Sequence, residues 1–244
     1  MKLDEKSWRR GHNDSSESRV LGIEIRGRKY VIVLPTRKRK LGKEFHRTHI
    51  NIHEQRMREG KDNTEEIRLN ATTILRPLTP LDAPDIFNAI RTQRNYLRRW
   101  LPFVDSTRTI EDTLRFIRSS VIDAERGDYV FVIVCEGRFA GLIGFKDTDR
   151  ENRRTELGYW LCEEYQGRGL MTAAVSALCR WMFKRQRMCR VQIKCATENA
   201  RSRAIPERLG FVHEGTERCG VRLANGRYTD LEVYSRLRTD KTKK

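Results

Sequence analysis

A glycine-bearing turn, Gln166-Gly167-Arg168-Gly169, separates an apolar run that ends at Trp160-Leu161-Cys162 from a long amphipathic stretch that begins at Leu170. Two glycines in four residues let the backbone bend so that successive N–H groups point into one small space. The positive end of the helix predicted to follow faces the same space. The sequence therefore predicts an anion site built from backbone amides, of a kind that suits a pyrophosphate.

This turn differs from two familiar phosphate-binding motifs. The dinucleotide-binding fingerprint needs glycines at its first, third and sixth positions, and the P-loop ends in Gly-Lys-Ser/Thr. Neither pattern occurs at residues 166–172. Because an ordinary strand-to-helix connection can also carry such a turn, the flanking elements must decide whether it is a ligand site.

The hydrophobic periodicity from about residue 67 onwards predicts one compact domain. Its order is a strand, two helices, three strands, a helix, a strand, a helix and two strands. The expected strands are 68–78, 129–135, 139–146, 154–162, 190–196, 212–222 and 228–237, and the expected helices are 81–100, 109–126, 169–183 and 199–209. This order predicts an α+β fold with a mixed sheet of six to seven strands, flanked by about four helices.

The rest of the chain is predicted to lie outside this domain. Residues 1–66 hold 17 Lys/Arg and 11 Asp/Glu, and are expected to form a basic, mostly disordered or weakly structured extension. Within it, residues 21–34 favour a small hairpin through Arg26-Gly27. The run 37–40 is compatible with nucleic-acid binding, but a solvated basic tail is the preferred explanation. The domain is expected to span 67–239 and a basic tail 240–244.

Composition narrows the class of protein. The 244 residues carry a net charge of +17, which favours polyanionic partners such as acyl-CoA, RNA or acidic protein surfaces. The sequence shows neither an apolar run of membrane-spanning length nor the apolar core of a signal peptide, so we expect a cytoplasmic protein with no membrane contact. Six scattered cysteines without a Cys-x-x-Cys pair predict reduced thiols and no metal site.

Four motifs in a fixed order point to a family. They are Glu156-Leu-Gly-Tyr-Trp-Leu161, Gln166-Gly-Arg-Gly-Leu-Met-Thr172, Asn199-Ala-Arg-Ser-Arg-Ala-Ile-Pro-Glu-Arg-Leu-Gly-Phe211 and Leu223-Ala-Asn-Gly-Arg-Tyr228. With them, residues 70–238 resemble the GNAT acyl-CoA N-acyltransferases, and more closely the branch of bacterial ribosomal-protein serine/alanine N-terminal acetyltransferases. The resemblance implies a GNAT-like fold with acetyl-CoA as the co-substrate.

The resemblance also implies a cofactor site. Backbone amides between Gly167 and Thr172 would hold the pyrophosphate, and Met171 departs from the small residue usual at its position. The strand that ends at Leu161 would splay from the next strand, so that the pantetheine arm fits between them. The implied cofactor-binding residues are Leu161, Cys162, Gln166, Gly167, Arg168, Gly169, Leu170, Met171, Thr172 and Asn199. Asn199 is also a favoured helix N-cap.

Three residues are candidates for catalysis. Ser202 matches the serine that, in this branch, stands near the thioester sulfur and helps the thiolate to leave, although a surface serine in a first helical turn needs no such explanation. Glu156 is the first candidate for the base and Glu217 the second, and a strand glutamate also serves in ordinary ion pairs. An α-amine has a pKa of about 8, so a weak base is enough. The segment 100–103 resembles the loop on the substrate side, or packs into the core.

The predicted function is transfer of an acetyl group from acetyl-CoA to a primary amine, by direct attack in a ternary complex. The acceptor that we expect is the N-terminal amine of a protein such as a ribosomal protein. Alternatives are a small amine, such as an aminoglycoside or polyamine, and a non-catalytic module that binds acyl-CoA or RNA. Acidic residues around the acceptor would favour a polycation. A ribosome or RNA contact through the basic extension and a homodimer are left open.

Overall fold

The computed structural model describes the backbone of residues 18–25 and 28–35, and residues 66–240 in full. The chain divides into two compact units, Met1–Asn63 and Thr64–Lys244. In the first unit, β1 (Ser18–Ile25) pairs antiparallel with β2 (Arg28–Pro35), which confirms the predicted hairpin. The expected domain limits stay predictions. The run 37–40 and residues 241–244 of the basic tail lie outside the described part.

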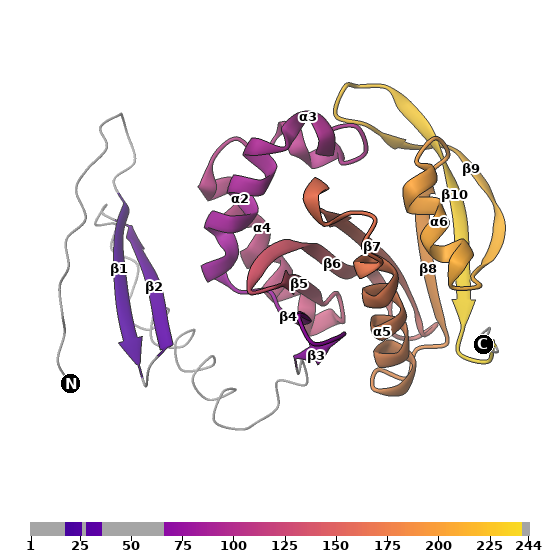
Figure 1. The fold of residues 1–244 in the computed structure, drawn as a ribbon, viewed down its shortest axis with the longest axis horizontal. Coiled ribbons are helices and arrows are strands. Elements are labelled where there is room, and N and C mark those ends of the chain that lie inside the picture. Colours follow the sequence, from indigo (N-terminus) through magenta and orange to yellow (C-terminus); the bar gives the residue numbers. More distant parts are fainter. Residues whose placement is uncertain (1–17, 26–27, 36–65, 241–244) are drawn as a thin grey trace. The chain divides into compact units, whose positions relative to one another are not determined.

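The second unit is built on one mixed sheet (Figure 1). Its strand order is β3-β4-β5-β6-β7-β8-β10-β9, and β7 and β8 are the one parallel pair. Its strands are β3 (Ile67–Arg68), β4 (Thr73–Pro77), β5 (Val130–Cys135), β6 (Arg138–Asp149), β7 (Arg154–Leu161), β8 (Arg190–Ala196), β9 (Val212–Arg222) and β10 (Tyr228–Leu237), and its α-helices are α2 (Ala83–Thr92), α3 (Arg94–Leu97), α4 (Ile110–Asp123), α5 (Leu170–Lys184) and α6 (Ala200–Arg208). The predicted mixed sheet is confirmed, with one strand more than expected.

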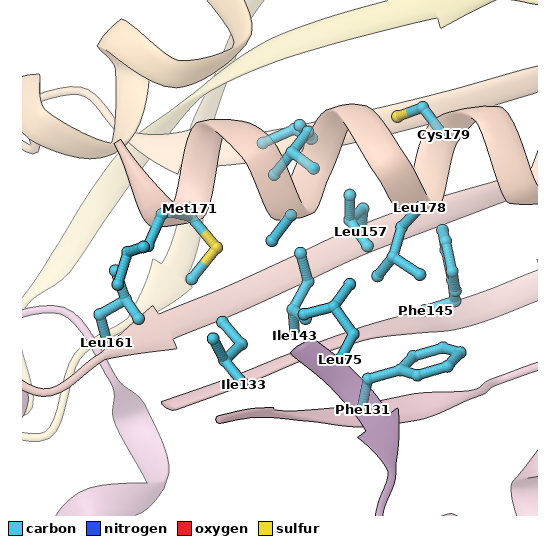
Figure 2. Close-up of a cluster of buried hydrophobic side chains, with 14 of the residues drawn as sticks. Leu75, Phe131, Ile133, Ile143, Phe145, Leu157, Leu161, Met171, Leu178 and Cys179 are labelled. Atoms are coloured by element: carbon cyan, nitrogen blue, oxygen red, sulfur yellow. The ribbon is translucent and has the colours of Figure 1, made fainter. Parts of the chain in front are cut away.

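Alternation along the strands sorts the core into two layers. Phe131 and Ile133 of β5 face α5, whereas Val132, between them, belongs to a second cluster with residues of α2 and α4. Figure 2 shows the first layer, in which α5 packs over the strands and runs along them. α5 therefore covers one face of the sheet, and α2 and α4 cover the other.

The first two expected elements differ from the sequence-based prediction. The expected strand 68–78 is two strands, because the chain reverses between β3 and β4 and the Asn70 side chain accepts from the Thr72 amide at 2.9 Å. The expected helix 81–100 divides into α2 and α3 at Gln93, whose backbone leaves the helical region at φ −111°, ψ 23°. The Gln93 side chain accepts from the Glu163 amide at 2.8 Å, which ties this break to the segment before the glycine turn.

Among the described residues, no helix combines the length and the apolar character that a membrane crossing needs.

Candidate active site

The glycine turn has the backbone conformation that the sequence predicted. Gly167 and Gly169 lie at φ 71° and 72°, and a Cβ added at either would meet nothing within 4 Å. Their requirement is therefore conformational, because L-residues rarely adopt this region. Gly169 is the N-cap of α5, and the Ala173 amide donates to its carbonyl at 3.0 Å. The amides of residues 170–172 precede that bond and have no intrahelical acceptor.

Two residues of the turn are fixed by the core beneath it. Leu170 and Met171 are 6% and 5% exposed and belong to the same cluster as Leu161. In Figure 2, Met171 and Leu161 lie together at the end of the cluster beside the start of α5. These side chains therefore pack inward, which leaves their backbone as the part that faces a ligand. This inward packing gives a physical reason for the large residue at position 171.

Arginines surround the turn. Arg208 of α6 donates to the Thr172 hydroxyl at 2.8 Å, and Arg201 donates to the Gln166 side-chain carbonyl at 2.6 Å. Arg168 pairs with Glu136 at 2.5 Å. Arg201 and Arg208 were missed by the sequence reasoning, although their spacing of seven residues on one predicted helix was a usable signal, since it places both on the same face.

The parallel strands β7 and β8 separate beside Leu161. They pair through only three positions, Arg154 to Glu156, with the last pair joining Glu156 to Gln192. β7 then continues with β6 alone, and β8 with β10. The splay that the resemblance implied is therefore confirmed, and one edge of β7 faces the gap.

Close contact between β6 and β7 fixes the end of β7 next to this gap. A Cβ at Gly141 would lie 2.2 Å from the Trp160 carbonyl oxygen, so only glycine permits the approach. The Cys162 amide donates to the Ala140 carbonyl at 2.9 Å. Burial raises the pKa of the Cys162 thiol to about 12, so this thiol is neutral at physiological pH. Cys162 therefore contributes to core packing here and does not act as a thiolate.

Three hydroxyl and thiol groups meet between the separated strands. Ser202 Oγ lies 3.2 Å from Cys195 Sγ of β8 and 3.4 Å from the hydroxyl oxygen of Tyr159 of β7. The Tyr159 hydroxyl also donates to the Ser202 carbonyl at 3.2 Å. Burial raises the pKa of Cys195, and raises that of Tyr159 well above its usual value. Sequence reasoning missed Tyr159 and Cys195 as members of this site.

Asn199 is the N-cap of α6. Its side-chain oxygen accepts a hydrogen bond from the Ser202 amide at 3.2 Å, which confirms the predicted capping role. The side chain lies next to the Ser202 group as a result. Its contact with the cofactor arm stays a prediction.

Glu156 lies on the opposite face of the sheet from α5, because the adjacent Leu157 points into the α5 cluster. It is 6% exposed. One carboxylate oxygen lies 2.8 Å from Lys146 Nζ, and the other accepts from Gln192 at 3.0 Å and lies 3.9 Å from Lys194 Nζ. Glu156 thus joins β6, β7 and β8 at the point where the sheet opens. Ser202 and Glu156 are on opposite sides of the sheet and are not brought into contact.

The surface next to Glu156 is open and electrically balanced. Gly158 is exposed, and a Cβ there would meet nothing within 4 Å. A shallow pocket of about 240 Å³ beside it is lined by Asp147, Arg154, Thr155, Glu156, Gln192 and Lys194. Two carboxylates thus face two cations. The second base candidate, Glu217, pairs with Lys194 at 2.7 Å.

The loop suggested for the substrate side divides between the core and the surface. Leu101 packs against the cluster formed with α2 and α4, and Phe103 is 42% exposed. Within residues 66–240, no three His, Cys, Asp or Glu side chains gather in the way a metal site requires.

These features fit an extended ligand with an anionic end. Open amides and three arginines lie at the glycine turn, and an unpaired strand edge leads from there to Ser202. Coenzyme A has this shape, with a diphosphate and a long amide-bearing arm. Gly167 and Gly169 permit the bend of this turn, because their positive φ values are rarely adopted by other residues.

Comparisons with known proteins agree with this geometry. The acetyltransferase (GNAT) domain model matches residues 72–212. YdaF of Bacillus subtilis (strain 168), to which a ribosomal N-acetyltransferase activity is assigned only provisionally, is 32% identical over 179 residues, covering 71% of this chain and 95% of YdaF. The ribosomal-protein-serine acetyltransferase of Escherichia coli (strain K12) is 27% identical over 175 residues, 71% of this chain and 97% of that protein.

A solved structure gives the same result. The ribosomal L7/L12 α-N-protein acetyltransferase RimL in complex with coenzyme A is 28% identical, with a TM-score of 0.68, and the match covers 71% of this chain and 98% of that one. The predicted family, fold, enzyme class and acetyl-CoA co-substrate are thereby confirmed. The chain belongs to the GNAT family of acetyltransferases.

Proposed function

We propose that this N-acetyltransferase acts on the α-amine at the N-terminus of a protein, and that ribosomal proteins are its substrate class. The names of its relatives support the proposal, because the E. coli protein is a ribosomal-protein-serine acetyltransferase and RimL acts on ribosomal L7/L12. The matches cover 97% of the E. coli protein and 98% of the RimL chain, which is nearly the whole length of each.

The charge balance next to the strand gap carries the choice of acceptor. A polyamine or aminoglycoside offers several positive charges, and a site for it needs carboxylates that the protein leaves unpaired. Here Glu156 lies 2.8 Å from Lys146, and Glu217 lies 2.7 Å from Lys194. Because lysines already compensate these carboxylates, the surface suits an acceptor with a single amine, such as a protein N-terminus.

The proposed roles follow from the two faces of the sheet. Glu156 accepts the proton of the amine from the face opposite α5, directly or through a water. Ser202 donates a hydrogen bond to the departing sulfur from the α6 side, with Tyr159 and Cys195 as its neighbours. Amides on the free edge of β7 stabilise negative charge on the carbonyl oxygen. Acetyl-CoA supplies the activated acetyl group, and no covalent enzyme intermediate is needed.

The test is a comparison of acceptors with the full-length protein. Free thiol release is followed with peptides that begin with serine or alanine, with spermidine and with an aminoglycoside, and mass spectrometry locates the acetyl group. We expect kcat/KM to be at least about tenfold higher for the peptides, a difference of about 1.4 kcal/mol in transition-state binding. The acetyl group should appear on the α-amine.

A control peptide with a blocked N-terminus and free lysines should remain unmodified. Turnover of spermidine that equals or exceeds that of the peptides contradicts the proposed acceptor. Comparing the N-termini of ribosomal proteins from cells with and without the enzyme then identifies the substrate within this class.

A further inference from the structure

A basic pocket lies at the end of α5 farthest from the glycine turn. Its volume is about 330 Å³, and it is formed by the C-terminal half of α5 and the end of β10. The charged residues that line it are Arg180, Lys184, Arg236, Arg238 and Asp240. α5 has 15 residues and is therefore about 22 Å long, so this pocket is separate from the acetyl-CoA site.

Three of the cations that line this pocket, Arg180, Lys184 and Arg238, carry its uncompensated positive charge. Asp240 is the acidic residue in the lining, and its carboxylate accepts from the Leu237 amide at 2.8 Å. Among residues 66–240, no carboxylate forms an ion pair with Arg180, Lys184 or Arg238. The pocket differs in this from the cations nearer the strand gap, such as Lys194, which pairs with Glu217 at 2.7 Å.

The helix end alone does not account for these cations. Arg180 and Lys184 lie in the last two turns of α5, where the helix dipole favours positive charge. Arg236 and Arg238 come from β10 and its end. Arg236 pairs with Val191, which places its side chain on the α5 face, and it is only 8% exposed. Two elements thus bring like charges together, and a bound anion relieves their repulsion.

We propose that this pocket binds the phosphate groups of RNA. Guanidinium groups bind phosphate through two parallel hydrogen bonds, and the pocket offers two exposed ones, those of Arg180 and Arg238. Phe183 packs against the core and is partly exposed where it lines the pocket, and a base can stack on this exposed part of the ring. The net charge of +17 attracts a polyanion from a distance. An acidic protein offers carboxylates but no base to stack on Phe183.

RNA binding at this pocket goes beyond the proposed function. Its expected effect on acetylation, however, rests on the proposed function, because it assumes that the substrate is a protein of a ribonucleoprotein particle. An enzyme held on RNA by one end of α5 presents its acetyl-transfer site, at the other end, to a protein in the same ribonucleoprotein particle. The contact therefore raises the turnover of a substrate within such a particle and leaves the turnover of a free peptide unchanged.

The experiment measures the affinity of full-length protein for a labelled single-stranded RNA by fluorescence anisotropy across a series of salt concentrations. The pocket variant is Arg180→Glu/Arg238→Glu. The matched control is Arg118→Glu/Arg126→Glu, which makes the same charge change at exposed residues of α4 and the turn after it, on the other face of the sheet. We expect the pocket variant to lose roughly tenfold in affinity and the slope of log K against log salt to fall by about 1 to 2.

The control should keep the wild-type affinity within about twofold. Equal losses in both variants, or no loss in the pocket variant, overturn the proposal. So does competition by polyglutamate that matches RNA at the same charge concentration. If the Glu variant does not fold, Arg180→Ala/Arg238→Ala is measured instead, and an unchanged affinity there also overturns the proposal.

Peptide acetylation separates this proposal from the proposed function. The pocket variant should acetylate a free N-terminal peptide at the wild-type rate. RNA binding without any peptide acetylation contradicts the proposed acceptor alone, whereas peptide acetylation without pocket-dependent RNA binding contradicts the RNA site alone.

Discussion

Ser202 Oγ lies 3.2 Å from Cys195 Sγ, at the place where β7 and β8 have already separated. The raised pKa values of Cys195 and Tyr159 keep both groups protonated at neutral pH. Ser202 therefore has neutral hydrogen-bond donors as neighbours. Such a group stabilises a departing thiolate by donating hydrogen bonds, and it is poorly suited to remove a proton from an amine.

Replacement of Ser202 tests this role. Ser202→Ala should lower kcat by about a hundredfold, because the hydrogen bond to the leaving sulfur exists mainly in the transition state. The KM for acetyl-CoA should change little. Steady-state thiol release measures both constants. Ser119→Ala, in an exposed turn of α4, is the control and should behave as wild type. A kcat above half of the wild-type value in Ser202→Ala contradicts the assignment.

Two substitutions at Asn199 separate its two roles. Asp is as good an N-cap as Asn, whereas Ala costs about 1 kcal/mol of stability. Asn199→Asp should therefore keep the free energy of unfolding, and Asn199→Ala should lose about 1 kcal/mol, as measured by urea denaturation. Both variants should bind acetyl-CoA about tenfold more weakly, since both lack the amide donor. Unchanged affinity in Asn199→Asp assigns the residue to capping alone.

Substitutions at Gly169 should differ in effect according to the size and charge of the new side chain. At φ 72° an L-residue at position 169 costs about 1–2 kcal/mol, although its Cβ meets nothing within 4 Å. Gly169→Ala should therefore fold with modestly reduced stability. Gly169→Glu places a carboxylate at the proposed diphosphate site and should abolish detectable acetyl-CoA binding in calorimetry. Gly226→Glu, at φ 82° in the turn between β9 and β10, should lose similar stability and keep its affinity.

Glu156 is tested by its effect on the pH–rate profile. Glu156→Gln keeps the size of the side chain but cannot accept a proton, so kcat should fall by about a hundredfold and the acidic limb of the profile should flatten. Glu217→Gln removes the other carboxylate that pairs with Lys194, and it should lower kcat by less than about threefold. A profile in Glu156→Gln that keeps the wild-type shape shows that Glu156 only supports the strand junction.

One ion pair predicts a pH dependence of stability. Arg190 donates two hydrogen bonds to Glu214, at 2.6 and 2.5 Å, and lowers the pKa of that carboxyl to about 2. Because the folded pKa lies below the unfolded value of 4.5, the stabilisation is present above pH 4.5 and disappears as the pH falls towards 2. The Glu214 side chain is 37% exposed, so screening reduces the contribution to about 1 kcal/mol.

Urea denaturation of wild type and Glu214→Gln checks this sign. The wild type should be about 1 kcal/mol more stable at pH 7, and the difference should shrink steadily below pH 4.5. Glu198→Gln is a control, because Glu198 pairs with Arg227 at a fully surface position. Its effect should be near zero throughout. A difference for Glu214→Gln that grows on acidification contradicts the linkage.

Local pattern predicted most of the fold. The expected bounds of β8 and of the last two strands agree with the structure to the residue, because period-two alternation and clear turns limit them. The break at Gln93 was not predictable, since it depends on a hydrogen bond to Glu163, 70 residues away. Helix propensity depends on residues that are close in sequence, whereas this hydrogen bond forms only when the folded chain brings the two segments together.

The candidate site likewise contains residues that the sequence indicated and residues that it did not. The glycine turn, Asn199 and Ser202 carry signals in their own sequence context, so they could be listed in advance. Tyr159 and Cys195 look like ordinary strand residues, and only the separation of β7 from β8 brings their polar atoms to Ser202. The lysines around Glu156 come from two other strands, and their pairing was equally invisible.

The separation of β7 and β8 also has a mechanical consequence. Three register pairs join the half of the sheet that begins at β3 to the half that ends at β9, and the gap proposed to hold the cofactor arm opens directly after them. A ligand bound in this gap contacts both halves of the sheet and stabilises them against separation. Occupancy should raise the melting temperature and slow amide exchange on both sides of the joint together, which makes the enzyme most rigid when it is loaded.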